Sequence, residues 1–417
     1  MIIERNYYLN KLIAKRHNGM IKIITGIRRC GKSFLLSTIY TNWLRQHNVD
    51  NNHIITINLE DRRNKELRDP DALLAYIDSK LTDEKVHYIM IDEIQHVNEF
   101  EDVLNSYLNI PNADVYVTGS NAKFLSKDVI TTFRGRGDEI KLHPLTFKEY
   151  STVRHGERSE LLRDYMIFGG LPQVVLEETN EGKIEKLKAL FDNTYQRDII
   201  ERYKIRSPEV LDELLNILAS SIGGLTNPSK LANTFVSVKH ENVSRNTIVK
   251  YLEYLCESFL TEKAERYDIR GKRYIDSPFK YYFTDCGLRN ARINFRQVEY
   301  SHLLENVIYN ELIARGFSVD VGVVVKQERN DMGERNRHYY EVDFVCNLGS
   351  KRYYIQSAYR MLNEEKVRQE ENSLRHIDDS FKKIIILGEY TPVLHSESGI
   401  TIIGIYDFLL KDNSLEL

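Results

Sequence analysis

The sequence predicts an α/β protein that begins with a parallel sheet covered by helices and ends in a second α/β domain. Three observations predict this. Short apolar, β-branched runs alternate with helical stretches through the first 145 residues, which is typical of a parallel sheet with both faces covered. A glycine-rich loop joins the first such run to the next helical stretch. From residue 146 the pattern is mainly helical, and strand-like runs dominate again only after about residue 299.

The expected strands of the first part are buried runs that end in polar residues, and the helices lie between them. The strands are Met20–Thr25, His53–Leu59, Val86–Ile91, Asp114–Thr118 and Glu139–Leu142; the helices are Arg5–Arg16, Phe34–Arg45, Asp69–Leu81 and Phe100–Leu108.

The remaining chain is expected to form three more domains. We predict an α/β core at 1–145, a helical lid at 146–206, a three-helix module with a basic hairpin at 207–295, and an α/β domain at 296–417. The helices are Leu161–Phe168, Gly182–Tyr203, Pro208–Gly223, Pro228–Thr234, Ser244–Glu257, Leu303–Arg315 and Lys366–Leu374; the strands are Tyr274-Ile275, Tyr281–Thr284, Ser318–Val325, Tyr339–Cys346, Lys351–Ser357, Lys383–Gly388 and Gly399–Ile405.

Composition excludes several classes of protein. The formal net charge of the 417 residues is −3, so any contact with nucleic acid must come from a local basic patch. The four cysteines lie far apart and form no C-x-x-C pair, which argues against a zinc site and against a disulfide framework. Neither a signal peptide nor a run of about 18 apolar residues is evident, so we expect a cytoplasmic protein without a membrane partner.

The glycine-rich loop satisfies the pattern G-x-x-x-x-G-K-[ST] and stands between an expected strand and an expected helix. Its glycines let successive backbone N–H groups face one anion, and the following helix adds its positive N-terminal end. The lysine reaches the β- and γ-phosphates, and the serine hydroxyl is a ligand for Mg²⁺. This context favours an ATP site over a chance turn; its residues are Gly26, Ile27, Arg28, Arg29, Cys30, Gly31, Lys32, Ser33 and Phe34.

Two acidic residues follow the third expected strand. Asp92 emerges at the carboxyl end of that strand, beside the loop, where it can hold Mg²⁺. Glu93 comes next, and a carboxylate there orients and deprotonates the attacking water. The pair favours ATP hydrolysis over small-molecule phosphorylation; the alternative is a solvated strand end.

Three further residues are candidates for the same chemistry. Ser120 and Asn121 follow the fourth strand and are placed to sense the γ-phosphate or the water, unless they form an ordinary turn. Arg136, just before the fifth strand, is placed to stabilise transition-state charge in a neighbouring subunit of a homo-oligomer; the alternative is an exposed basic loop.

The three-helix module with its basic hairpin resembles a winged helix-turn-helix. Duplex DNA would meet the start of the last helix and the hairpin. The alternative is a packing module whose charges are solvated, which acidic residues on the same helix support. The expected DNA contacts are Arg245, Asn246, Lys250, Arg270, Lys272 and Arg273.

Together these motifs resemble a family of prokaryotic AAA-type P-loop ATPases that are related to archaeal ATPases and carry a C-terminal domain of unknown function. The resemblance rests on the following stretches: Gly26–Ser33, Ile91-Asp92-Glu93, Thr118-Gly119-Ser120, Gly135-Arg136, Leu142–Phe147 and Gly169-Gly170-Leu171-Pro172. It implies an ASCE-type P-loop core, a helical lid, a winged helix and a C-terminal fold like that of restriction endonucleases.

The implied endonuclease site is degenerate in this chain. Such sites use a helix Glu, a hairpin Asp and a Glu-x-Lys on the next strand. Glu305 and Asp343 supply the first two, but Gln356 replaces the third acid and Ala358 stands where the lysine is needed. Lys351 lies on the same expected strand at an unhelpful spacing. We therefore expect no nuclease activity.

Two functions remain open on the sequence alone. The first is an ATPase that hydrolyses ATP with Mg²⁺ and acts at DNA. The second is a slow, nucleotide-gated switch that binds DNA or a protein partner. An ATP-dependent nuclease is a weaker third alternative.

Overall fold

The computed structural model describes residues 2–119, 135–193, 199–239, 243–329, 335–360 and 364–417. These residues form two compact units, with the boundary after Pro144; the short stretch Glu257–Phe259 groups with the first unit. No helix in the described ranges is long and apolar enough to cross a membrane.

A parallel sheet organises the first unit, and its described strands run in the order β2-β3-β4-β1-β5. β4 thus lies between the strand before the glycine-rich loop and the strand that ends in Asp92. The strands are β1 (Ile21–Thr25), β2 (Ile54–Asn58), β3 (His87–Asp92), β4 (Ala113–Thr118) and β5 (Gly137–Lys141); the helices are α1 (Asn6–Ala14), α2 (Lys32–Phe34), which continues through the π-helical turn Leu35–Tyr40 into α3 (Thr41–Gln46), then α4 (Pro70–Asp78) and α5 (Phe100–Ser106).

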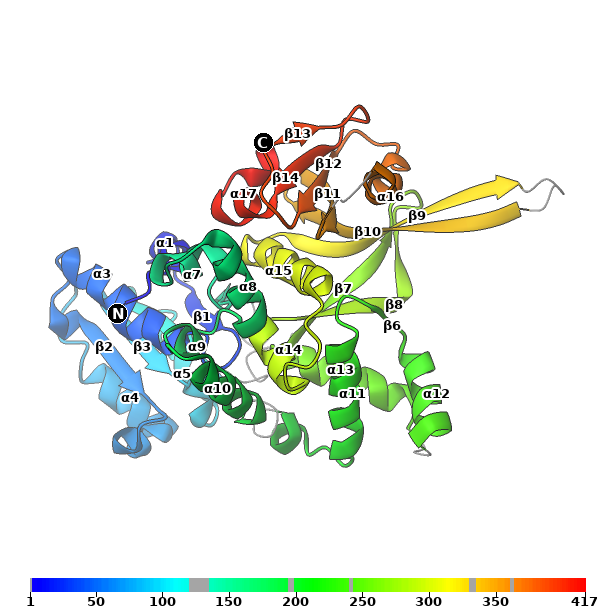
Figure 1. Ribbon diagram of the computed structural model, residues 1–417. Helices are drawn as coiled ribbons and strands as arrows, with labels where there is room; N and C mark the ends of the chain where they lie inside the picture. The colour runs from blue at the N-terminus through cyan, green and yellow to red at the C-terminus, as the bar shows by residue number, and fades with distance from the viewer. Residues whose placement is uncertain (1, 120–134, 194–198, 240–242, 330–334, 361–363) are drawn as a thin grey trace. The chain divides into compact units, whose positions relative to one another are not determined.

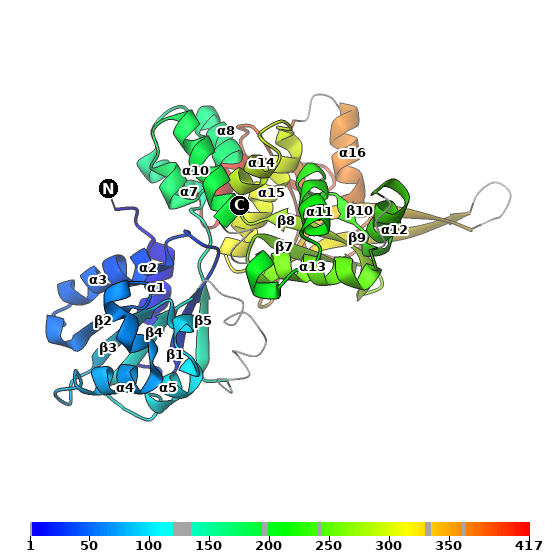
Figure 2. The ribbon, with the colours of Figure 1, turned by 90° about the horizontal axis from the view of Figure 1, so that it is seen from below.

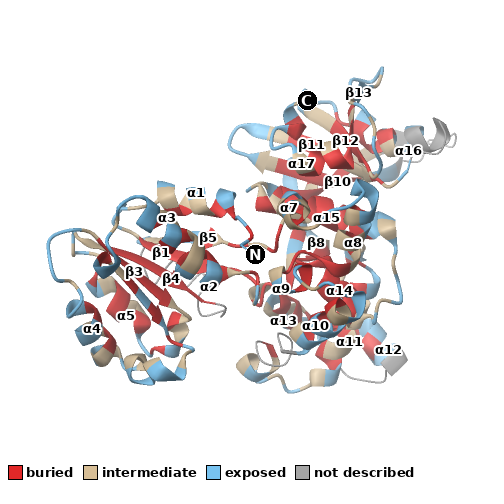
Figure 3. Ribbon diagram, turned by 60° about the vertical axis from the view of Figure 1, so that its left-hand side comes forward, coloured by how far each residue is buried: buried red, intermediate tan, exposed pale blue. Residues whose placement is uncertain are grey.

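Helices cover both faces of this sheet, as the alternating pattern predicts (Figure 2). Alternate strand residues, such as Ile23 and Ile91, pack against Leu73 of α4 and Phe100 of α5 in one apolar core. On the other face the Tyr40 hydroxyl contacts that of Tyr116, 2.6 Å away. Within this unit, the strands carry much of the buried colour in Figure 3.

The second unit begins with helices and continues into a mixed sheet (Figure 1). The helices are α7 (Phe147–Val153), α8 (Arg158–Phe168), α9 (Pro172–Val175), α10 (Asn180–Asn193), α11 (Pro208–Ser220), α12 (Pro228–Lys239), α13 (Arg245–Glu257), α14 (Cys286–Arg292), α15 (Tyr300–Ala314), α16 (Glu364–Arg375) and α17 (Ile405–Leu410); the strands are β6 (Leu225–Thr226), β7 (Thr261–Asp268), β8 (Arg273–Phe283), β9 (Ser318–Arg329), β10 (Arg335–Leu348), β11 (Lys351–Ala358), β12 (Lys382–Leu387), β13 (Leu394–His395) and β14 (Thr401–Gly404).

The sheet of the second unit joins two segments that the sequence analysis treats separately. Its described strands run in the order β13-β14-β12-β11-β10-β9-β7-β8-β6, and β7 pairs in parallel with β9. The hairpin β7–β8 and the C-terminal strands therefore share one sheet across residues 295 and 296. The division into domains at 206/207 and 295/296 stays a prediction.

The structure corrects the prediction around the hairpin. Tyr274-Ile275 and Tyr281–Thr284 were predicted as two strands, but β8 is one strand from Arg273 to Phe283, and its partner β7 was not predicted. β7 reads Thr-Glu-Lys-Ala-Glu-Arg-Tyr-Asp, and its polar residues break the apolar pattern by which a strand is found.

The motif Gly169-Gly170-Leu171-Pro172 has a packing role. The Gly170 N–H donates to the Asp285 carboxylate over 2.7 Å, and a Cβ on Gly169 would lie 2.1 Å from an oxygen of that carboxylate. Asp285 also caps α14 by accepting the Leu288 N–H. The glycines thus let the end of α8 approach a buried acid.

Candidate functional site

The glycine-rich loop lies at the carboxyl end of β1 and requires both of its glycines. Gly26 has φ 139°, and a Cβ there would lie 2.1 Å from the Leu142 carbonyl oxygen. Gly31 has φ 103° immediately before α2. Both conformations lie in the region that L side chains rarely adopt. The backbone can therefore fold tightly around an anion, as the motif predicts.

The lysine of the motif lies across this loop. Lys32 is buried, and its Nζ donates to the carbonyl oxygens of Gly26 over 2.9 Å and of Ile27 over 3.2 Å. Arg5 supports the loop from α1's side, because its guanidinium donates to the Cys30 carbonyl over 3.3 Å. The sequence analysis missed Arg5, since a lone arginine near the start of a chain carries no motif.

Asp92 is held beside the loop at the end of β3. Its Oδ1 accepts a hydrogen bond from the Ser33 hydroxyl over 2.9 Å and another from the Thr118 hydroxyl at the end of β4. Burial raises the pKa of Asp92 above its ordinary value, and these two hydrogen bonds oppose the rise. A divalent cation at this carboxylate would favour its charged form. The structure thus brings together both oxygen ligands that the sequence predicts for Mg²⁺.

Glu93 occupies a left-handed backbone conformation, with φ 55°. For a residue other than glycine this costs on the order of 1 kcal/mol, and such strain clusters at functional sites. The Glu93 N–H donates to the Thr118 hydroxyl over 3.1 Å, and its carboxylate accepts from the Gln95 amide. Thr118 therefore connects both acidic residues; the sheet order that creates this contact was not visible in the sequence.

Three further residues were predicted for this site, and the described part of the chain shows no contact between any of them and the phosphate-binding loop or the acidic pair. Arg136 is exposed, and its carbonyl accepts the Ile21 N–H over 3.0 Å. Ser120 and Asn121 lie outside the described residues.

The expected DNA contacts lie on α13 and on the β7–β8 hairpin. Arg245, Asn246 and Lys250 are exposed on α13, and Lys272 is exposed at the tip of the hairpin. The other two hairpin residues contact acidic side chains of the same chain. Arg270 pairs with Asp378 at 2.8 Å, and the Arg273 side chain lies 3.9 Å from Asp268.

The degenerate endonuclease residues come together in the second unit. Glu305 is on α15, Asp343 on β10 and Gln356 on β11, and the Asp343 N–H donates to Gln356 Oε1 over 3.4 Å. The N–H and hydroxyl of Ser357 both donate to the Asp343 carboxylate, over 2.8 and 2.7 Å. Burial raises the pKa of Asp343 to about 7, and the Glu305 charge adds to this rise.

A buried lysine that the sequence analysis missed completes this cluster. Lys280 of β8 has its Nζ 2.9 Å from a Glu305 oxygen and 2.8 Å from a Glu341 oxygen. The Tyr282 hydroxyl donates to the same Glu305 oxygen over 2.7 Å. Burial alone would lower the pKa of Lys280, but Glu305, Asp343 and Glu341 together raise it. The cluster therefore contains its own ammonium group, although Ala358 stands at the expected lysine position.

The comparisons with known proteins agree with the geometry of the first unit. The family model of an AAA domain matches residues 18–151, and a domain of unknown function matches residues 159–299. An uncharacterized protein of Haemophilus influenzae is 35% identical over 98% of this chain and 99% of its own length. An uncharacterized protein of Methanocaldococcus jannaschii is 30% identical over 84% of this chain and 77% of its own length.

Solved structures show a more distant likeness. The Aeropyrum pernix Orc1 protein in complex with DNA matches at 11% identity over 70% of this chain and 93% of that chain, with a TM-score of 0.28. This score is too low to carry an argument. The family match, the two relatives and the phosphate-binding loop with its acidic strand end lead to one conclusion: the chain belongs to a family of AAA-type P-loop ATPases shared by bacteria and archaea.

Proposed function

We propose that this chain binds ATP with Mg²⁺ at Gly26–Phe34 and hydrolyses it. The observation that carries the proposal is the continuous set of hydrogen bonds from the Ser33 hydroxyl through Asp92 and Thr118 to the Glu93 backbone. It couples the phosphate-binding loop to the two acids needed for hydrolysis.

Each residue has a distinct role in this proposal. Lys32 supplies the cation that faces the β- and γ-phosphates. Ser33 and Asp92 would hold Mg²⁺, because hydroxyl and carboxylate oxygens are its preferred ligands. Mg²⁺ would neutralise charge on the phosphates. Glu93 accepts the proton of the attacking water, and the γ-phosphoryl group passes to that water.

Two variants test these roles separately. Lys32→Ala is expected to abolish ATP binding in equilibrium dialysis, whereas Glu93→Gln should retain binding and lose turnover in a phosphate-release assay. Lys65→Ala and Glu66→Gln, which alter exposed residues of the same unit, serve as controls. Wild-type affinity in Lys32→Ala would contradict the assigned nucleotide site, and wild-type turnover in Glu93→Gln would exclude Glu93 as the base.

We further propose that the ATPase acts at duplex DNA through α13. The support is the exposed group Arg245, Asn246 and Lys250 near the start of that helix. Arg270 pairs with Asp378, whereas Arg245 and Lys250 form no ion pair with any residue that the structure describes. Because the net charge of the chain is −3, such a local group must provide the attraction to phosphate.

The DNA proposal is tested by the salt dependence of binding. The double variant Arg245→Ala/Lys250→Ala should bind duplex DNA more weakly and with a shallower dependence on salt, because fewer counterions are released. Lys188→Ala changes an exposed lysine of α10 and should leave both quantities unchanged. If the double variant and the wild type bind DNA identically at all salt concentrations, α13 does not contact DNA through these residues and the three helices serve only in packing.

A slow nucleotide-gated switch is the second candidate, and the Gln95 contact favours it. The Gln95 amide engages the carboxylate that must accept the proton of water. Turnover measured with and without duplex DNA separates the two functions. Stimulation severalfold supports the DNA-acting ATPase, whereas nucleotide that stays bound through many minutes supports the switch.

A further inference from the structure

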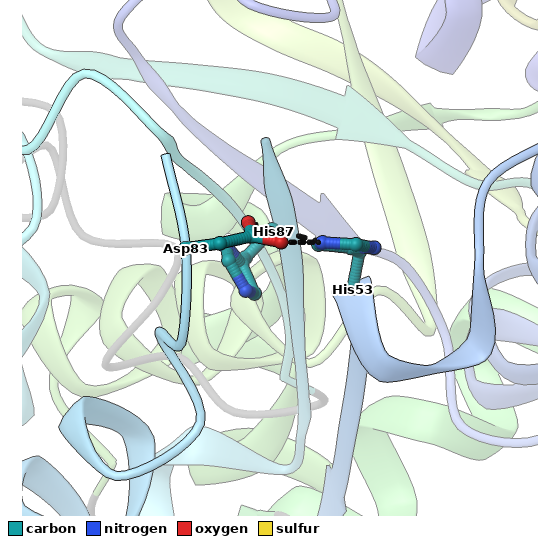
Figure 4. Close-up of side chains that lie close together, drawn as sticks. All are labelled: His53, Asp83 and His87. Carbon is teal, nitrogen blue, oxygen red and sulfur yellow. Dashed lines mark hydrogen bonds and ion pairs between the residues drawn. The ribbon is translucent and has the colours of Figure 1, made fainter. Parts of the chain in front are cut away.

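A second group of chemically active side chains lies at the amino ends of the strands in the parallel sheet. His53 immediately precedes β2, and His87 is the first residue of β3. Because Ile54 pairs with Tyr88 in these neighbouring strands, the two histidines lie side by side at the amino ends of the strands. Asp83, in the turn before β3, joins them (Figure 4). The phosphate-binding loop lies at the carboxyl ends, so this group is separate from the ATP site.

The three side chains lie close to the spacing of metal ligands. His53 Nε2 lies 3.0 Å from Asp83 Oδ2 and 3.1 Å from Oδ1. One ligand atom from each of the three residues lies within 4.8 Å of the other two. Tetrahedral zinc with bonds of about 2.0–2.1 Å separates its ligand atoms by roughly 3.4 Å. A small movement of one imidazole ring would therefore close the group around an ion.

His87 supplies an independent observation. It is fully buried, and neither of its ring nitrogens has a hydrogen-bond partner in the described part of the chain. A buried polar group without a partner costs about 1–3 kcal/mol, so such a group calls for an explanation. A lone pair directed to a metal ion would satisfy the ring.

The surroundings orient the other two ligands. The Lys85 N–H donates to Asp83 Oδ1 over 2.9 Å, and Asn112 donates to the Asp83 carbonyl over 2.8 Å. The Asp83 carboxylate in turn contacts His53 Nε2 over 3.0 Å and holds that ring in place. Asp50 lies 4.0 Å from the other ring nitrogen of His53, which is too far for a hydrogen bond.

We propose that His53, Asp83 and His87 form a site for a divalent transition ion of the zinc class. Two imidazoles and one carboxylate suit Zn²⁺ and disfavour Mg²⁺, which prefers oxygen ligands. The ion fastens the turn that carries Asp83 to the starts of β2 and β3, and it thereby stabilises the edge of the ATPase core.

The test measures Zn²⁺ binding by the full chain after removal of metal with a chelator. Competition with a chromophoric chelator gives the affinity, and Co²⁺ gives a visible spectrum characteristic of tetrahedral nitrogen and oxygen ligands. We expect stoichiometric Zn²⁺ binding that raises the thermal unfolding temperature. Asp83→Asn and His53→Asn should each weaken binding by about tenfold or more and remove the thermal shift.

The controls separate this site from ordinary surface binding. Glu84→Gln removes one exposed charge at the neighbouring position and should bind Zn²⁺ like the wild type. Asp83 is itself exposed, so Asp83→Asn is expected to fold even if a change at buried His87 does not. No Zn²⁺ binding by the wild type, or equal affinity in Asp83→Asn, His53→Asn and Glu84→Gln, would overturn the proposal.

Discussion

Replacing Lys280 with methionine should destabilise the second unit strongly. The side chain is 4% exposed, and its ammonium contacts the carboxylates of Glu305 and Glu341 at 2.9 and 2.8 Å. Methionine preserves the length of the side chain but leaves the buried Glu305 carboxylate without its cation. Removing one partner of a buried ion pair costs about 3–5 kcal/mol. For a unit of this size, that corresponds to a fall of about 6–20 °C in the unfolding temperature.

Differential scanning calorimetry of the full chain measures this fall in unfolding temperature. Two further variants show whether the loss of the buried cation causes it. Lys351→Met breaks an exposed pair with Glu416 and should cost less than about 1 kcal/mol. Lys280→Met/Glu305→Gln removes one of the stranded charges and should recover part of the loss. Equal unfolding temperatures for Lys280→Met and Lys351→Met would refute the idea that Lys280 neutralises the cluster.

Three other predictions address assembly, cleavage and pH. Mixing Arg136→Ala with Lys32→Ala should restore some ATPase activity if subunits share sites; a confirmed mixed oligomer without rescue excludes an inter-subunit role. The chain should not cleave DNA with Mg²⁺ or Mn²⁺, and metal-dependent nicking that is lost in Asp343→Ala would establish a nuclease. Burial raises the pKa of Asp285 to about 6 in the folded chain, so its protonated form favours folding below about pH 4 and this contribution is lost as the pH rises through 6. Asp285→Asn should therefore flatten the dependence of unfolding free energy on pH between 4 and 6, and an unchanged slope in urea titrations would contradict this assignment.

The parts predicted well from sequence are those in which local pattern and chemistry coincide. The loop at Gly26–Ser33 needs a strand before it and a helix after it, and both are read directly from apolar periodicity. Asp92 could be predicted because it is the first polar residue after an apolar run that has the length of a buried strand. The order of the strands, and hence the contact of Thr118 with Asp92, depends on pairing between distant segments and has no local signal.

The acidic cluster of the second unit illustrates the same limit. Glu305 and Asp343 were found through a motif, but Lys280 lies 25 residues before Glu305 on a strand whose partner β7 is mostly polar. Nothing in the local sequence distinguishes a buried lysine from a solvated one. Burial of Lys280 depends on how β8, β10 and α15 pack together in the folded chain.

The shared sheet also has a mechanical consequence. α13 leads within a few residues into β7, which pairs with β8 along most of its length and with β9 at Arg266–Asp268. A sheet resists shear along its strands, because sliding would break a whole ladder of hydrogen bonds at once. A force that a bound partner applies to α13 would therefore be transmitted through β7 to β9 and β10. We therefore expect helices α11, α12 and α13 and the cluster around Glu305 and Asp343 to move together as one rigid body.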